Sequence, residues 1–168
     1  MSGALAQPDA VSPALTPRGR ARVILAGFGT VGMSVCYDLR FPELYRAMSR
    51  KGAVLLTVPA AFTLVTGKDH WEVLLRARAI ENLAYTMGVN CVGLDGNGLA
   101  YTGDSALLDM RGEYLVEVGN QETSITRALR RSELAAFRER FPALHDGDPF
   151  ELQTLIRSSE AEKTRLLK

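Results

Sequence analysis

The sequence predicts an α/β domain built on a mixed sheet, and three observations lead to this fold class. Residues 53–58 form a short, continuous apolar run, which is typical of a strand covered on both faces. Residues 69–85 carry apolar side chains at helical spacing, and we expect Trp71 in this segment to be a core residue. The chain has 168 residues, 46% hydrophobic and 23% charged, which suffices for one core without disulfides or bound metal.

Turn and capping residues set the limits of the predicted elements. Pro42 suits the first turn of a helix, and Gly52 lies just past its end. Residues 110–112 are expected to form a tight hairpin turn, and Ser132 to cap the last helix. In chain order, the expected elements are strands 22–26 and 31–36, helix 43–51, strand 53–58, helix 69–85, strands 86–92, 105–109, 113–118 and 122–126, and helix 133–141.

Gly27, Gly29 and Gly32 form a G-x-G-x-x-G pattern after a predicted strand, as in dinucleotide-binding domains. Such a site needs a helix that begins at the third glycine and an acidic residue about twenty positions later. The residues after Gly32 favour a strand, Pro42 would interrupt a helix, and strand 53–58 ends without a carboxylate. A hairpin turn is therefore the better interpretation.

Charge and cysteine content exclude several classes of protein. Twenty basic residues against 19 acidic ones leave a net charge of +1, without the basic excess of nucleic-acid or anionic-membrane binders. No apolar run is long enough to span a membrane. The two cysteines and two histidines lack metal-ligand spacing, and we expect Cys91 to lie in the core. We expect no metal, cofactor, nucleic-acid or membrane partner, and a reducing, cytoplasmic location.

Cys36 stands at the end of a predicted strand, before a sharp turn. A lone cysteine at such a position is most often a small buried hydrophobe. It can instead project into a cleft as a nucleophile, with the following N–H groups receiving an oxyanion. Arg40 could then favour the thiolate or hold the turn through a carboxylate. Neither His70 nor His145 lies in a motif that pairs with the thiol, so spacing alone leaves both interpretations open.

Four blocks of sequence resemble one known family. Residues 32–43, GMSVCYDLRFPE, are similar to the nucleophile motif of the nitrilase, or carbon–nitrogen hydrolase, superfamily. Residues 59–71, 74–82 and 89–105 agree with that family in order and spacing, so the resemblance covers about residues 18–152. The ending FPALHDGDPFEL and the DGNG and GDS segments resemble the omega-amidase branch, whereas AFTLVTGKDHW resembles amidases of deaminated glutathione.

The resemblance implies a fold and a reaction. The fold is part of a four-layer α-β-β-α sandwich of the nitrilase type, often doubled in a dimer that packs through helices. In the reaction, a cysteine thiolate attacks an amide or nitrile carbon, ammonia leaves, and water hydrolyses the thioester. The implied substrate is a small ω-amide of a carboxylic or oxo-acid, with no cofactor and no metal.

The resemblance also implies roles for individual residues. Cys36 is the nucleophile, and the backbone N–H of Tyr37 lies in the oxyanion site. Phe62 and Thr63 match family positions near the substrate pocket, although core packing explains Phe62 almost as well.

Charged residues near these blocks have two interpretations. Arg76, Arg78 and Glu81 either brace the turn that follows Cys36 by ion pairing or form a solvated helix face. We assign site-supporting roles to Arg40 and Glu81.

The sequence departs from the family pattern before the nucleophile. The family places a glutamate base and an oxyanion lysine N-terminal to the cysteine, whereas the first of each here are Glu43 and Lys51. We therefore expect residues 18–152 to be a partial, C-terminal portion of the domain, with a disordered leader at 1–17 and a polar tail at 153–168.

This departure shapes the expected function. A free cysteine has a pKa of about 8.5, so without a base the thiol stays mostly protonated at neutral pH. Loss of one oxyanion donor costs on the order of 10²–10³ in rate. We expect a cysteine-dependent amidase impaired by these losses, acting as a homo-oligomer or paired with a missing N-terminal half. The alternative is a non-catalytic truncated remnant or assembly subunit.

Overall fold

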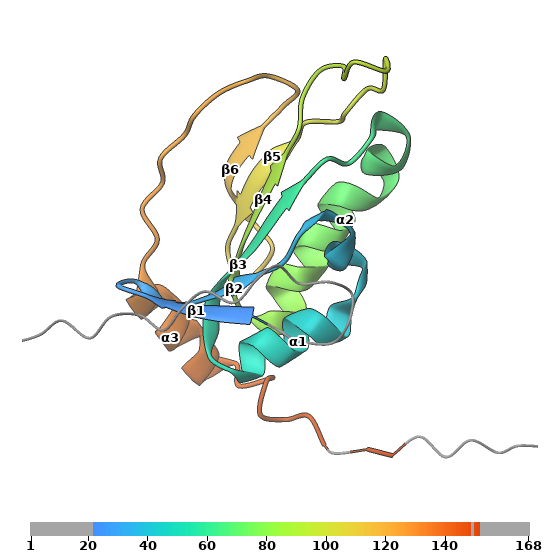
Figure 1. Ribbon diagram of the computed structural model, residues 1–168. Helices are drawn as coiled ribbons and strands as arrows, with labels where there is room; N and C mark the ends of the chain where they lie inside the picture. The colour runs from blue at the N-terminus through green and yellow to red at the C-terminus, as the bar shows by residue number, and fades with distance from the viewer. Residues whose placement is uncertain (1–21, 149, 152–168) are drawn as a thin grey trace, which may run out of the picture.

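One mixed six-stranded sheet crosses the molecule in the order β1-β2-β3-β4-β5-β6 (Figure 1). The computed structural model describes residues 22–148, 150 and 151, so the expected leader at 1–17 and tail at 153–168 lie outside the described residues. β2, β3 and β4 run parallel and the other neighbours antiparallel, which confirms the mixed sheet. The strands are β1 (Arg22–Ala26), β2 (Gly29–Met33), β3 (Ala53–Ala60), β4 (Tyr85–Asn90), β5 (Ser105–Leu108) and β6 (Tyr114–Val118).

Two helices cover one face of this sheet. α1 and α2 contact each other and pack against β3 and β4 (Figure 1). α3 packs near the ends of these strands through Leu134, which clusters with Val54 and Tyr85. None of the helices in the described part of the chain is long and apolar enough to span a membrane. The helices are the 3-10 helix η1 (Cys36–Arg40), α1 (Pro42–Arg50), α2 (Leu64–Asn82) and α3 (Arg131–Arg140).

Two glycines allow the helices to approach the sheet closely. A methyl group at Gly88 would lie 2.5 Å from a Leu75 methyl carbon and 2.7 Å from the Trp71 ring. A methyl group at Gly32 would lie 2.9 Å from the sulfur of Met48. Such distances leave no space for a larger residue in a close-packed core. The expected core role of Trp71, which is 1% exposed, is confirmed.

The glycine-rich segment after β1 is a hairpin, as predicted. β1 and β2 are antiparallel and pair Ala26 with Gly29. Gly32 lies within β2 and begins no helix, which excludes the dinucleotide-binding interpretation. β2 ends at Met33 rather than at residue 36, so Cys36 lies beyond the strand.

Several observed element boundaries differ from the predicted ones because of tertiary contacts. α2 begins earlier than predicted, at Leu64, and it ends where Leu83 adopts a left-handed φ of 45°. The prediction of a strand at 122–126 was wrong, because these residues lie in an irregular segment beside the sheet. Ser132 does not cap α3, whose N-cap is Arg130 with no capping side chain.

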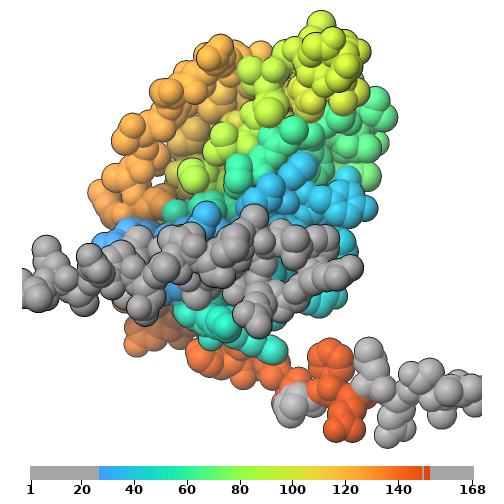
Figure 2. All heavy atoms as spheres, in the orientation of Figure 1, coloured from blue at the N-terminus to red at the C-terminus, as the bar shows by residue number. Residues whose placement is uncertain are grey.

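The sheet face opposite α1 and α2 is apolar and partly open. Register places Met33, Thr57, Met87 and Leu107 in one row on this face. Met33 is 41% exposed, and Val89 is 51% exposed. A cavity of about 710 Å³ lies between this face and residues 121–129, which belong to the orange segment in Figure 2. The described residues supply one helical layer and one sheet, two of the four layers that the resemblance implies.

Candidate active site

Cys36 opens η1 in a conformation that non-glycine residues rarely adopt. Its φ is 47°, in the left-handed region, and its side chain is half-buried against the core. A carboxylate oxygen of Asp38 accepts the N–H of Val35 over 2.9 Å, and the N–H of Asp38 donates to the Val35 carbonyl over 3.0 Å. These bonds close a sharp turn around the thiol, which we call the nucleophile turn (residues 34–40).

The chain enters the nucleophile turn through Ser34, which is tied to β3 and α1. The N–H and the hydroxyl of Ser34 both donate to the carbonyl of Thr57, over 3.0 and 2.9 Å. The Tyr45 hydroxyl lies 2.6 Å from Ser34 Oγ and donates to it, because the serine proton is already engaged. Burial raises the pKa of Tyr45 well above its ordinary value, so this hydroxyl remains a donor.

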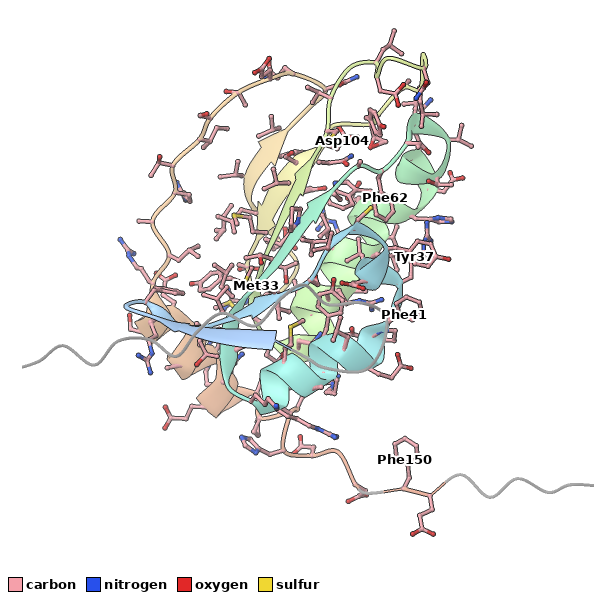
Figure 3. The ribbon with its side chains drawn as sticks, in the orientation of Figure 1. Met33, Tyr37, Phe41, Phe62, Asp104 and Phe150 are labelled. Carbon is pink, nitrogen blue, oxygen red and sulfur yellow. The ribbon has the colours of Figure 1, made fainter. Side chains whose placement is uncertain are left out.

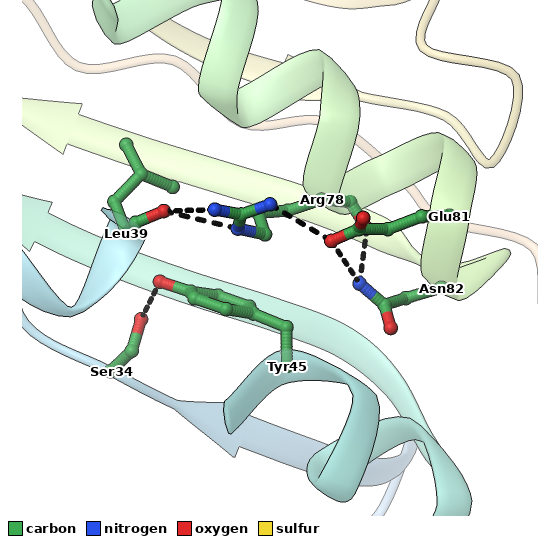
Figure 4. A network of polar contacts seen from close by, with 6 residues as sticks. All are labelled: Ser34, Leu39, Tyr45, Arg78, Glu81 and Asn82. Carbon is green, nitrogen blue, oxygen red and sulfur yellow. Dashed lines mark hydrogen bonds and ion pairs between the residues drawn. The ribbon is translucent and has the colours of Figure 1, made fainter. Parts of the chain in front are cut away.

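The carbonyl of Leu39, near the end of the turn, is held by Arg78 of α2 (Figure 4). Nε and Nη2 of this guanidinium donate to the Leu39 carbonyl over 3.0 and 2.6 Å. Nη1 donates to Glu81 Oε1 over 2.9 Å, and the same oxygen accepts from Asn82 Nδ2 over 3.3 Å. Arg78 is only 4% exposed. Arg78 thus contacts the nucleophile turn directly, and Glu81 acts on it only through Arg78, so the two do not form a solvated helix face.

Arg76 lies two positions earlier on α2 and holds a different turn. Its Nε pairs with Glu72 Oε1 at 2.8 Å, and its Nη1 donates to the carbonyl of Gly112. Its guanidinium carbon lies 4.4 Å from the centre of the Tyr114 ring. These contacts fasten the β5–β6 turn to α2, so bracing of the nucleophile turn is excluded for Arg76.

Arg40 lies over two aromatic rings beside the nucleophile turn. Its guanidinium carbon is 5.3 Å from the centre of the Tyr37 ring and 5.4 Å from that of Phe62. Its Nη1 is 3.2 Å from His70 Nδ1. Figure 3 shows Phe62 on the same side of the molecule as Tyr37, which belongs to η1. Among the described residues Arg40 has no carboxylate partner, so its contacts beside the turn are with aromatic rings and His70 rather than with a carboxylate.

The two predicted pocket residues have different surroundings. Phe62 is buried, its ring centre lies 5.0 Å from that of Trp71, and its N–H donates to Asn90 Oδ1 over 2.7 Å. Thr63 is half-buried and is the N-cap of α2. Phe62 is connected to the nucleophile turn through the Arg40 guanidinium, whereas Thr63 lies at the start of a helix.

Sequence reasoning missed the buried polar residues that hold this region. Asn90, the last residue of β4, donates to the Thr102 hydroxyl over 3.0 Å and to the Gly103 carbonyl over 2.9 Å. Ser34 and Tyr45 are likewise buried and paired. The sequence did offer one signal, which is a polar residue next to an apolar strand run. Such a residue is buried with the strand and therefore needs hydrogen-bond partners.

The cavity on the open sheet face is separate from the nucleophile turn. Its walls include Cys91, which is exposed rather than in the core as predicted, and they do not include Cys36. The reactivity of a thiol depends on its immediate surroundings rather than on cavity size, so we assign the candidate site to the nucleophile turn. Within the described residues, no three His, Cys, Asp or Glu side chains are grouped so as to hold a metal ion.

The sequence matches the carbon-nitrogen hydrolase family over residues 4–139. The chain belongs to this family. It is 44% identical over 117 residues to the deaminated glutathione amidase of Synechocystis, a match that covers 70% of this chain and 43% of that protein. It is 43% identical over 138 residues to the omega-amidase of Escherichia coli, covering 80% of this chain and 52% of that protein. The chain spans about half the length of these curated relatives.

Solved structures agree with this family assignment. A carbon–nitrogen hydrolase superfamily protein of Xanthomonas campestris, with an arsenic adduct in its active site, is 40% identical at a TM-score of 0.72, covering 80% of this chain and 53% of that one. A mutant amidase of Nesterenkonia, with the acetamide moiety of fluoroacetamide added to its active-site cysteine, is 34% identical at a TM-score of 0.55, covering 62% and 39%. The predicted fold class and the family resemblance are confirmed.

Proposed function

We propose that this chain carries the nucleophile of a cysteine-dependent amidase that hydrolyses a small ω-amide of a carboxylic or oxo-acid. The observation that carries the proposal is the left-handed conformation of Cys36 at the start of η1, within a turn held on both sides. Non-glycine residues in such conformations concentrate at functional sites. The names of the relatives support the amide substrate, and the acetamide adduct of the Nesterenkonia amidase supports a cysteine nucleophile.

The proposed reaction proceeds through an acyl-enzyme. The thiolate of Cys36 attacks the amide carbon and forms a C–S bond, and the N–H of Tyr37 donates to the resulting oxyanion. The C–N bond then breaks, and the nitrogen takes a proton and leaves as ammonia. Water attacks the thioester, which releases the carboxylic acid and the thiol. Phe62 and Thr63 border the substrate, and Arg40 and Glu81 support the site.

The base and the charged oxyanion donor come from outside this sequence in our proposal. Residues 1–35 contain neither glutamate nor lysine. The isolated chain is therefore expected to be impaired, and an N-terminal polypeptide supplies the missing groups. The reaction needs a reduced thiol, which fits a cytoplasmic location.

Labelling with fluoroacetamide tests the nucleophile. We expect the purified chain to form an acetamide adduct at Cys36, read by mass spectrometry of peptides. Cys91 is the internal control, because it is exposed and lies in no comparable turn. Equal labelling of the two cysteines, or labelling of Cys91 alone, would contradict the proposal.

Complementation tests the reaction itself. The N-terminal half of the Escherichia coli omega-amidase, added in trans, is expected to restore ammonia release from a small ω-amide. Cys36→Ala should abolish this release, and Cys91→Ala should leave it unchanged. Stable association of the two polypeptides with equal activity in Cys36→Ala would show that Cys36 has no catalytic role.

A second candidate function is assembly without catalysis. The observation that favours it is the open apolar sheet face, where Met33 and Val89 are 41% and 51% exposed. Such a face is suited to a partner sheet. Light scattering combined with an ammonia-release assay distinguishes the candidates. A stable monomer that releases ammonia from ω-amides by itself would exclude the assembly role.

A further inference from the structure

The nucleophile turn needs contacts that hold Cys36 in place. A non-glycine residue at a φ of 47° persists only where the surrounding structure maintains it. η1 has five residues, too few for its own hydrogen bonds to fix its position on the sheet. The side chain of Leu39 is fully buried, which anchors the end of the turn by packing.

Arg78 provides a polar tie between this turn and a long helix. Two of its N–H groups converge on the carbonyl of Leu39, 39 residues earlier in the chain. The guanidinium is planar and rigid, so two donors on one acceptor fix the carbonyl in direction as well as in distance. α2 has 19 residues and packs against β4 and β5, which makes it a rigid base for the tie.

The surroundings of Arg78 fix its own orientation. Glu81 Oε1 accepts from Nη1 at 2.9 Å and balances a guanidinium whose side chain is 5% exposed. The Tyr45 ring centre lies 5.3 Å from the guanidinium carbon, and the Tyr45 hydroxyl reaches Ser34 on the other side of the turn. Arg78 and Tyr45 therefore connect both ends of the nucleophile turn to the helices (Figure 4).

We propose that Arg78 is a positioning residue, which sets the place of the Cys36 thiol by holding the Leu39 carbonyl, and that Glu81 orients Arg78 for this role. The inference rests on the proposed nucleophilic role of Cys36 and adds the device that keeps it aligned. Arg76 has matching partners but holds the β5–β6 turn, so it provides a control on the same helix.

Hydrogen exchange tests the structural half of this proposal. In Arg78→Met, exchange of the amides of residues 36–40 is expected to accelerate, while that of residues 109–113 stays as in the wild type. Arg76→Met is expected to give the reverse pattern. Unchanged exchange of residues 36–40 in Arg78→Met would overturn the proposal, whatever the chain proves to catalyse.

Alkylation kinetics test the positioning half. Fluoroacetamide forms a C–S bond with the thiolate as fluoride leaves. Its limiting rate of reaction with Cys36 is expected to fall about tenfold to hundredfold in Arg78→Met, while the reagent concentration that gives half of this rate changes little. Arg78→Lys, which retains a donor, should recover part of the rate and serves if Arg78→Met does not fold. Iodoacetamide, a less selective reagent, should show no comparable loss.

The possible outcomes separate the two proposals. Faster exchange of residues 36–40 with an unchanged fluoroacetamide rate at Cys36 would overturn the positioning role. Labelling of Cys36 no faster than that of Cys91 in the wild type would count against the proposed function, while the exchange pattern would still decide whether Arg78 holds the turn.

Discussion

Arg76 and Arg78 lie two positions apart on α2 and contact the same kinds of groups, yet they hold different turns. Each donates to a backbone carbonyl, pairs with a glutamate of α2 and lies over a tyrosine ring. The Arg78 side chain is 5% exposed and reaches the nucleophile turn, whereas that of Arg76 is 32% exposed and reaches the β5–β6 turn. Residues two apart on a helix point in different directions, so similar contacts serve different parts of the fold.

The difference in burial indicates how much each arginine contributes. Water can replace the contacts of a partly exposed ion pair, and such pairs contribute little to stability. A buried charge that loses its partner has no such replacement. The two arginines therefore offer a matched comparison between a brace inside the protein and one at its surface.

The largest expected difference between the two braces is in stability. Arg78→Met is expected to lower the free energy of unfolding by about 3 kcal/mol, because the Leu39 carbonyl and Glu81 lose their charged partner. Arg76→Met should lower it by less than about 1 kcal/mol. Urea titrations followed by circular dichroism measure both values. Equal losses would show that burial does not separate the two.

The backbone of the two turns gives a second comparison. Gly112 has a φ of 81° in the β5–β6 turn, and Cys36 has a φ of 47° in the nucleophile turn. Gly112→Ala is expected to cost about 1–2 kcal/mol, because alanine resists this region. Cys36→Gly should relieve the same kind of strain, offset by lost packing and by a glycine entropy cost of about 0.5–1 kcal/mol. We expect a net change near zero.

Chemical denaturation of these two variants decides the point. A large loss of stability in Cys36→Gly would mean that the cysteine side chain is retained for packing. Retained stability would mean that a strained cysteine is kept where glycine would fit.

The tyrosines under the two arginines predict a smaller, pH-dependent difference. Tyr45→Phe is expected to cost about 1 kcal/mol at neutral pH through the lost Ser34 hydrogen bond. Burial raises the pKa of Tyr45 in the folded state, so the folded protein holds this proton more tightly than the unfolded chain. The stability linked to this proton is complete below pH of about 10 and falls as the pH rises further.

Stability curves at alkaline pH test this sign. Tyr45→Phe should flatten the fall in unfolding free energy above pH of about 10. Tyr114→Phe is the control, because burial also raises the pKa of Tyr114 but its side chain is only half-buried. A steeper alkaline fall in Tyr45→Phe than in the wild type would contradict the assignment.

Most elements were predictable because their signals are local. Pro42 at the start of α1 and the apolar run of β3 lie within the segments that they define. The errors lie where distant residues decide the outcome. Cys91 lies in a segment with the composition of a strand interior, but β4 ends one residue before it and Cys91 is exposed. Residues 122–126 are β-rich, yet they lie across the open sheet face without joining it.

The sequence by itself determined the α/β class, the hairpin at Gly29, the family and Cys36 as the candidate nucleophile, because periodicity, turn residues and motif blocks lie in contiguous stretches of chain. Only the tertiary structure decided that Arg78 rather than Arg76 holds the nucleophile turn, and that Ser34 and Tyr45 hold its other side. Arg78 contacts a carbonyl 39 positions away, and no spacing rule along the chain reports which helix face will meet it. The distinction arises only when α2 packs against the sheet and one of the two arginines becomes buried.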